Sequence, residues 1–150
     1  MVALLGGAAL LLAGCGAVAH MTATSGDPPR GKQYFISGTS PACASCHTLA
    51  AAGAQGVVGP NHDAAFGPDR CQGFSQSTIL DVVRGQIAYA DPSPGVDWPP
   101  NSTNPVAGMP PNLATGQKAK DIAAYVASVA GVTHGPGPHW DCQTGAEAAN

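Results

Sequence analysis

The sequence predicts an all-α domain of about three to four helices joined by long loops. Three observations favour this fold class. Capping residues or apolar residues at helical spacing mark three segments, and no segment alternates apolar and polar residues as a half-buried strand does. The chain is also rich in Gly (20) and Pro (14). Seven prolines fall between Asp91 and Asn112, so this segment can be neither a helix nor a central strand.

A first helix is expected from about Pro28 to Ile36. Asp27 can cap its N-terminus, Pro28 suits the first helical position, and Gly38 can end it. Further along, the segment AAAGAQGVVGPN is typical of a loop because it is rich in Gly and Ala.

Two later helices are expected from their apolar spacing. Ser77 and Thr78 can cap a helix that runs to about residue 88. Its apolar side chains are Ile79, Leu80, Val82, Val83 and Ile87. The last helix is expected from residue 115 or 116 to about residue 130, where Gly131 can close it. One face of this helix carries Ile122, Tyr125, Val126 and Val129.

The first residues have the character of an export signal. Residues 1–19 carry no charge, and their apolar run has the length of a signal-peptide core but is short for a membrane span. The positive residues usual at the start of such signals are absent. We therefore expect a leader over 1–19, a flexible tether over 20–27, a folded domain over 28–131 and a tail over 132–150.

Two ways of processing this leader are visible in the sequence. LAGC, Leu12 to Cys15, resembles the lipobox of bacterial lipoproteins, in which the cysteine becomes lipidated and N-terminal. AVA, Ala17 to Ala19, instead fits ordinary signal cleavage, and an uncleaved anchor is a third alternative. The lipobox is the favoured interpretation, with Cys15 as the lipidation site. All three place the domain outside the cytoplasm.

The pentapeptide CASCH, Cys43 to His47, is the most informative motif of the chain. Half a zinc site and a thioredoxin-like redox pair are the alternatives. Zinc needs further ligands at close spacing, whereas Cys71 and Cys142 stand alone, and the redox motif needs a βαβ frame. Attachment of haem c needs this spacing, because two thiols on one helical turn can reach the two vinyl groups of one porphyrin edge. The motif predicts thioethers to Cys43 and Cys46, with His47 as the proximal iron ligand.

A sixth iron ligand can be sought among methionines and histidines. Met1 is the initiator and Met21 lies in the leader or tether, which leaves Met109 within the domain. Prolines stiffen its loop, VAGMPPN, and Met109 is the predicted distal ligand. The alternatives are a methionine that only fills a core gap, and ligation by His62, His134 or His139 instead.

In combination, these motifs make the chain resemble a monohaem class I cytochrome c of the bacterial lipoprotein type, over about residues 31–131. The segments that carry the resemblance are GKQYF, CASCH, GPN, GMPPN and DIAAYVASV. The resemblance implies a cytochrome c fold wrapped around one covalently bound haem c. It also implies that the Pro60 carbonyl accepts the proximal imidazole N–H, and that Gly31 and Phe35 pack against Ile122 and Tyr125.

One departure from the family pattern is His62, which follows GPN where an apolar residue against the haem is usual. Three interpretations are open: a polar contact at the haem edge, a competing ligand, or a surface histidine, of which the last is favoured. The segment between Phe35 and Cys43 is also longer than in the most compact members.

Five cysteines are present, and the favoured assignments use three of them. Cys15 goes to the lipid, and Cys43 and Cys46 go to the haem. The remaining pair, Cys71 and Cys142, is expected to form a disulfide in an oxidising compartment and to tie the tail back onto the domain. Two unpaired thiols are the alternative.

The predicted function is one-electron transfer outside the cytoplasm, without enzymatic activity of its own. A six-coordinate iron has no vacancy for substrate, and the chain lacks the common catalytic motifs. The expected partners are redox proteins of a membrane respiratory chain and the membrane itself, through the lipid. Nucleic acid is not expected, since charged residues make up 10% of the chain and the net charge is -3. The alternatives are a haem subunit of a larger dehydrogenase or oxidase, and a five-coordinate peroxidase-like or gas-sensing protein.

Overall fold

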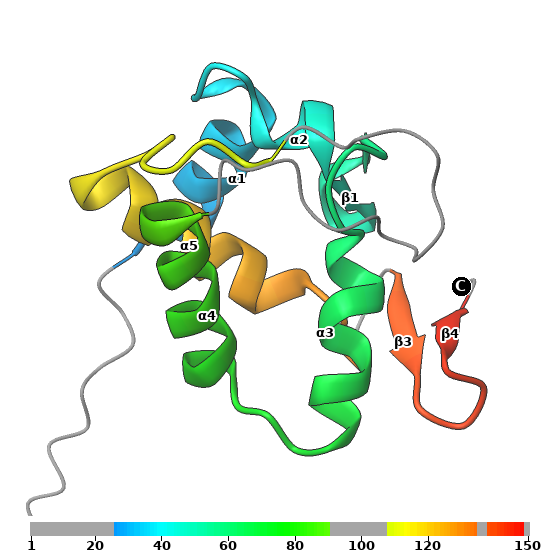
Figure 1. Ribbon diagram of the computed structural model, residues 1–150. Coiled ribbons are helices and arrows are strands. Elements are labelled where there is room, and N and C mark those ends of the chain that lie inside the picture. The colour runs from blue at the N-terminus through cyan, green and yellow to red at the C-terminus, as the bar shows by residue number, and fades with distance from the viewer. Residues whose placement is uncertain (1–25, 91–107, 135–137, 149–150) are drawn as a thin grey trace, which may run out of the picture.

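The computed structural model describes residues 26–90, 108–134 and 138–148. Its helices are α1 (Pro28–Ser37), α2 (Cys43–Cys46), α3 (His62–Cys71), α4 (Gln76–Tyr89) and α5 (Gly116–Val129). A short 3₁₀ turn, η1 (Ala50–Ala52), and four short strands complete the described elements. The predicted all-α class is confirmed, because the helices form the domain and the strands add only two small hairpins (Figure 1). The prolines from Pro92 to Pro105 lie outside the described residues.

Helix α1 begins and ends where its capping residues predict. The Asp27 carboxylate accepts a hydrogen bond from the Arg30 amide at 3.1 Å, and the Gly38 amide donates to the Tyr34 carbonyl at 2.8 Å. Both contacts satisfy backbone groups that a helix end leaves without partners. The helix starts at Pro28, which lacks an amide hydrogen that would otherwise need a partner.

Helices α1 and α5 cross in direct backbone contact near the centre of the domain (Figure 1). At the crossing, a Cβ on Gly31 would lie 1.9 Å from the carbonyl oxygen of Asp121 and 2.8 Å from the Cβ of Tyr125. Only glycine fits there. One turn further along, the rings of Phe35 and Tyr125 meet edge to face with centroids 6.1 Å apart. The expected packing of Gly31 and Phe35 on α5 is therefore present, with Ile122 in the same buried cluster.

A buried carboxylate joins the two helices at their crossing. Asp121 has no exposed side-chain surface, and its oxygens accept hydrogen bonds from the Arg30 guanidinium at 2.5 Å, the Gln117 amide at 2.9 Å and the Asp27 backbone amide at 2.8 Å. The pKa of Asp121 is lowered to about 2, mainly by the hydrogen bond from Arg30 and further by those from Gln117 and Asp27. Burial acts in the opposite direction and would by itself raise this pKa. The carboxylate is thus held charged between α1 and α5.

Helix α3 was not expected from the sequence, which predicted a loop over AAAGAQGVVGPN and no helix between this loop and Ser77. Asn61 caps it by accepting from the amides of Asp63 and Ala64 at 2.8 and 3.2 Å. Pro68 lies within the helix, at a position that ordinarily breaks one. Near the C-terminal end of α3, the Arg70 guanidinium donates hydrogen bonds to the carbonyls of Ala127 and Ala130. These carbonyls lie at the C-terminal end of α5, where a helix leaves its last carbonyls without backbone partners.

The short strands were also missed. Strands β1 (Thr48–Leu49) and β2 (Ala54–Gln55) pair antiparallel around η1, and β3 (His139–Asp141) pairs with β4 (Ala146–Ala148). Each strand has only two or three residues, too few for an alternating pattern to stand out. Helix α4 begins slightly earlier than expected, because Ser75 rather than Ser77 caps it. Val82 is 43% exposed, whereas the other apolar residues predicted for this helix are buried.

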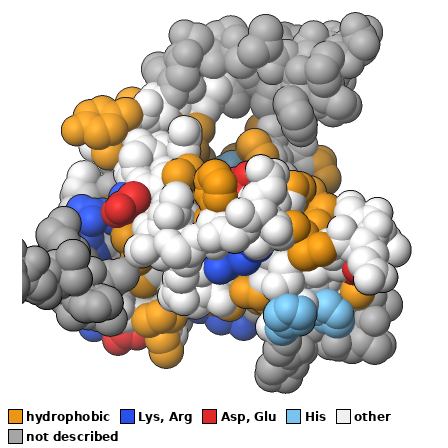
Figure 2. All heavy atoms as spheres, turned by 90° about the horizontal axis from the view of Figure 1, so that it is seen from below, with side chains coloured by type: hydrophobic (Ala, Val, Ile, Leu, Met, Phe, Trp, Pro, Cys, Tyr) orange, Lys and Arg blue, Asp and Glu red, His pale blue; other side chains and the backbone are white. Residues whose placement is uncertain are grey.

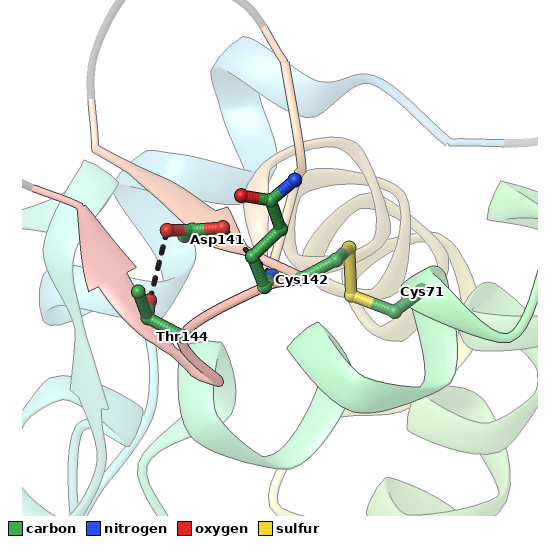
Figure 3. The surroundings of a disulfide bond; sticks show 5 residues. Cys71, Asp141, Cys142 and Thr144 are labelled. Atoms are coloured by element: carbon green, nitrogen blue, oxygen red, sulfur yellow. Dashed lines mark hydrogen bonds between the residues drawn. A yellow bond between two sulfur atoms is a disulfide. The ribbon is translucent and has the colours of Figure 1, made fainter.

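The C-terminal hairpin is held against α3 by a disulfide and by a tryptophan (Figures 1 and 3). Cys71, the last residue of α3, is bonded to Cys142, with the two Cα atoms 5.6 Å apart. The predicted pairing is therefore present in the structure. The buried ring of Trp140 lies so close to Gly67 that a Cβ there would be 2.1 Å from it. In the turn beside the disulfide, the Thr144 hydroxyl donates to Asp141 at 2.9 Å (Figure 3).

Substitution of Asp121 by Asn should destabilise the fold in a pH-dependent way. It removes the charge from a buried carboxylate that accepts several hydrogen bonds, and we expect a loss of about 1–3 kcal/mol in the free energy of unfolding near neutral pH. The pKa of Asp121 is about 2 in the folded state, below its ordinary value of 3.8. The charged carboxylate therefore stabilises the folded state fully at pH values above about 4. That contribution disappears as the pH falls from about 4 through about 2.

Denaturant unfolding of both proteins across this pH range measures the effect. Asp81→Asn is the matched control, because the Asp81 side chain is 77% exposed and its substitution should be nearly neutral. A difference between wild type and Asp121→Asn that stays constant across the pH range would contradict the stabilising role of the charge.

Candidate functional site

The two thiols of the CASCH motif lie on the single turn of α2. Cys43 and Cys46 begin and end this turn, and both are partly buried free thiols, in contrast to the disulfide-bonded Cys71 and Cys142. Burial raises the pKa of the Cys43 thiol, partly offset by the Thr39 hydroxyl 3.7 Å away. The predicted arrangement of two neighbouring thiols on one helical turn is therefore present.

His47 follows as the residue that ends α2, and its ring is held from one nitrogen. Nδ1 lies 2.9 Å from the carbonyl oxygen of Pro60, the contact that the family resemblance implies. A carbonyl can only accept a hydrogen bond, so Nδ1 carries a proton, and in the neutral imidazole this leaves the lone pair on Nε2. A neutral imidazole in this tautomer is the form that binds a metal through Nε2.

Two glycines of the loop after β2 bring its backbone against the motif. A Cβ on Gly56 would lie 2.5 Å from the carbonyl carbon of Cys46, and one on Gly59 would lie 2.4 Å from Cε1 of His47. The Gly59 amide donates to the Cys46 carbonyl at 2.7 Å. Larger residues at either position would push the loop away and take the Pro60 carbonyl out of reach of the imidazole.

His62 is not the surface histidine that was favoured from the sequence. It is the first residue of α3, it is partly buried, and its ring stacks on that of His47 with centroids 4.5 Å apart and an angle of 15° between planes. Phe35 and Phe66 flank it at 5.9 and 6.1 Å. Burial, and next the neighbouring His47, lower the pKa of His62 to about 3. The favoured interpretation was wrong because the helix that carries His62 was not recognised in the sequence.

The backbone around His62 is fixed by a second buried carboxylate. Asp63 is 6% exposed, and its oxygens accept from the amide of Ala50 at 2.8 Å and from that of Gly131 at 3.1 Å. These bonds join the start of α3 to η1 and to the end of α5. The nearby Tyr125 hydroxyl is buried and has no hydrogen-bond partner among the described residues. The pKa of Tyr125 is raised to about 12, mainly by burial and further by the negative charge of Asp63.

Met109 lies in a segment without regular structure just before α5. It is partly buried and packs against the hydrophobic core. Two residues past Pro110, the Asn112 amide donates to the Ile87 carbonyl at 2.7 Å and ties this segment to α4. Its role as an iron ligand stays a prediction. Of the rival ligands, His134 is exposed and His139 lies in β3.

The surroundings of the site carry little charge. From Gln33 to His62 the chain contains no Asp, Glu, Lys or Arg. Within this stretch Val57 is 88% and Val58 is 45% exposed. Figure 2 draws the lower side of the molecule as Figure 1 shows it, away from α2, and there the described charged side chains form small separate groups between hydrophobic and uncharged ones. Among the described residues, no helix combines the length and apolar character needed to cross a membrane.

The donor set fits a covalently bound porphyrin. Two reduced thiols and an imidazole with a free Nε2 are adjacent, whereas the cysteines elsewhere in the described chain are oxidised. Thiols of this kind can form thioethers, and the imidazole can hold iron. Cys43, Cys46 and His47 would therefore hold the haem, with the Pro60 carbonyl orienting His47.

Comparison with protein families agrees with this donor set. A family model described as Cytochrome c matches residues 29–130. Among solved structures, the c-type cytochrome SorU from Sinorhizobium meliloti is 29% identical over 69% of this chain and 90% of that chain, with a TM-score of 0.42. A comparison with curated proteins gave no match. The family match spans well over half of the chain and contains the attachment motif, so the chain belongs to the cytochrome c family, whose members bind haem c covalently and transfer electrons.

Proposed function

We propose that this protein is an exported one-electron carrier that holds a single haem c between His47 and Met109 and serves a membrane respiratory chain. The observation that carries the proposal is the adjacency of two free thiols and an imidazole whose Nδ1 is already bonded to the Pro60 carbonyl. When bound, the haem supplies an iron that exchanges single electrons.

The chain's own residues would determine how the site behaves. Thioethers to Cys43 and Cys46 make the attachment permanent, and the hydrogen bond to Pro60 fixes the tautomer of His47 and raises its basicity. A thioether sulfur from Met109 would favour ferrous iron and raise the reduction potential relative to two histidines. With both axial positions filled, no position is left for oxygen or a substrate, which supports a carrier rather than an enzyme.

The partner chemistry follows from the scarcity of charge. The stretch from Gln33 to His62 has no Asp, Glu, Lys or Arg of its own, and Val57 is among its most exposed side chains. Two charges that do lie against it are the ammonium groups of Lys32 and Lys118, which donate to the carbonyls of Ala51 and Gly38. We infer that redox partners meet this protein through uncharged contacts, aided by a shared attachment to the membrane. The lipid on Cys15 would supply that attachment. The tether expected over 20–27 would give the domain reach only up to residue 25, because Gly26 lies against Lys120 and the Asp27 amide is bonded to Asp121.

Covalent haem on Cys43 and Cys46 is the test of the proposed function. Wild-type protein, made together with haem-maturation machinery, should run as a haem-stained band on a denaturing gel and gain the mass of one haem. Replacing both residues with Ala should abolish the stain. Replacing both Cys71 and Cys142 with Ala is the matched control, because those residues are bonded to each other and the stain should remain. An unstained wild-type band beside a stained control cytochrome would contradict the proposal.

Distal ligation by Met109 makes a spectroscopic prediction. The ferric holoprotein should show the weak red charge-transfer absorption of a methionine sulfur on low-spin iron. Met109→Ala should remove this absorption and lower the reduction potential, because the soft sulfur stabilises ferrous iron. Met109→His should keep the iron six-coordinate but lower the potential. A wild-type spectrum of five-coordinate, high-spin iron would instead favour a peroxidase-like or gas-binding protein.

Lipidation of Cys15 predicts where the protein fractionates. In a bacterium that processes lipoproteins, most of the wild type should remain with membranes, and the mature chain should begin at a diacylglyceryl-modified Cys15. Cys15→Ser should block the modification, because the lipid is added to the thiol. Ala17→Leu is the control, since it spoils the ordinary cleavage pattern and should change nothing. A soluble wild-type chain that begins at His20 would show ordinary cleavage.

A further inference from the structure

We propose that His62 is a positioning residue for the haem iron, and that it fixes the rotation of the His47 imidazole about its bond to the metal by stacking on the face of that ring. The inference rests on the proposed haem ligation by His47. It concerns a residue at which this chain departs from the apolar side chain that its family usually has.

The geometry of the two rings is the first argument. Their centroids are 4.5 Å apart and their planes differ by only 15°, so the two imidazoles overlap face to face. The hydrogen bond from Nδ1 of His47 to Pro60 holds one point of the ring but leaves it able to swing about that point. Contact across the face restricts this swing. The hydrogen bond and the stack together define the plane of the ring, which neither does alone.

The second argument is that His62 cannot itself move easily. Phe66 stacks on it with an angle of 17° between planes, and Phe35 meets it at 60°, so the His62 ring lies among three other aromatic rings. Its backbone lies between Asn61, which caps α3, and Asp63, whose carboxylate is bonded to Ala50 and Gly131. A ring fixed this well can transmit its orientation to a neighbour.

The same contact argues against His62 as a rival distal ligand. A ligand for the second axial position must approach the iron from the side opposite to His47. A ring stacked 4.5 Å from His47 lies beside that residue and so would not face it across a bound iron. His62 therefore acts on the ligand and not on the iron directly.

The orientation of an axial imidazole has a direct spectroscopic consequence. In low-spin ferric haem, the plane of the imidazole lifts the degeneracy of two iron d orbitals and so sets how unpaired spin spreads over the porphyrin. The order and spread of the four haem-methyl proton signals report this orientation. They respond to rotation of the ligand plane even where ligation and attachment are unchanged.

The test uses the holoprotein and two variants of the same residue. His62→Leu has a side chain of the kind usual in the family and removes the flat ring, and we expect it to lose the wild-type order of haem-methyl signals. His62→Phe keeps a flat ring and should retain that order. His134→Leu, the same substitution at an exposed histidine, is the matched control and should match the wild type.

The possible outcomes separate this inference from the proposed function. A His62→Leu protein with covalent haem, low-spin iron and an unchanged methyl order would overturn the positioning role while leaving the carrier function intact. The role would also be overturned if His62→Phe altered the order as much as His62→Leu, since the polarity of the imidazole and not its stacking would then matter. A wild type without covalent haem or without His47 on the iron would overturn the proposed function itself.

Discussion

The rest of the structure depends on the close crossing of α1 and α5. The contact is possible because Gly31 has no side chain, so the backbone of one helix rests on the Asp121 carbonyl of the other. Asp121 then holds the crossing with its carboxylate, and the edge-to-face pair of Phe35 and Tyr125 fills the space beside it. Phe35 also touches His62, so the crossing is continuous with the wall of the haem site.

A second set of contacts places the loop that follows the attachment motif. Asp63 fastens the start of α3 to η1 and to the end of α5, and the Gly59 amide is bonded to the Cys46 carbonyl. Between these two anchors lie Pro60, which orients His47, and His62, which stacks on it. The His47 imidazole is thus contacted by two residues of one short segment that is fixed at both ends.

The parts of this protein that sequence could predict are those with local signals. The cap at Asp27 and the spacing of the two thiols each depend on residues close together in the chain, and the structure agrees with both. The packing of Gly31 at the crossing was expected only from the family resemblance, because its partners lie far along the chain. Helix α3 was missed because Gly67 and Pro68 weigh against a helix. Tertiary contacts stabilise α3 despite the low helix propensity of these two residues. Trp140 packs on Gly67, and the disulfide holds the end of the helix. The position of His62 depends on that helix and could therefore not be predicted from the sequence.

The disulfide of the C-terminal hairpin has a consequence for how the protein matures. Attachment of haem needs Cys43 and Cys46 as thiols, whereas Cys71 and Cys142 must lose their hydrogens to pair. One chain therefore needs both reduced and oxidised cysteines, and an oxidant that joined Cys43 to Cys46 first would block the attachment of haem. The order of events matters: the haem thiols must be reduced or already occupied when the tail is closed. Folding of α3 against the hairpin brings the correct partners to a Cα separation of 5.6 Å, and so favours their pairing over the alternatives.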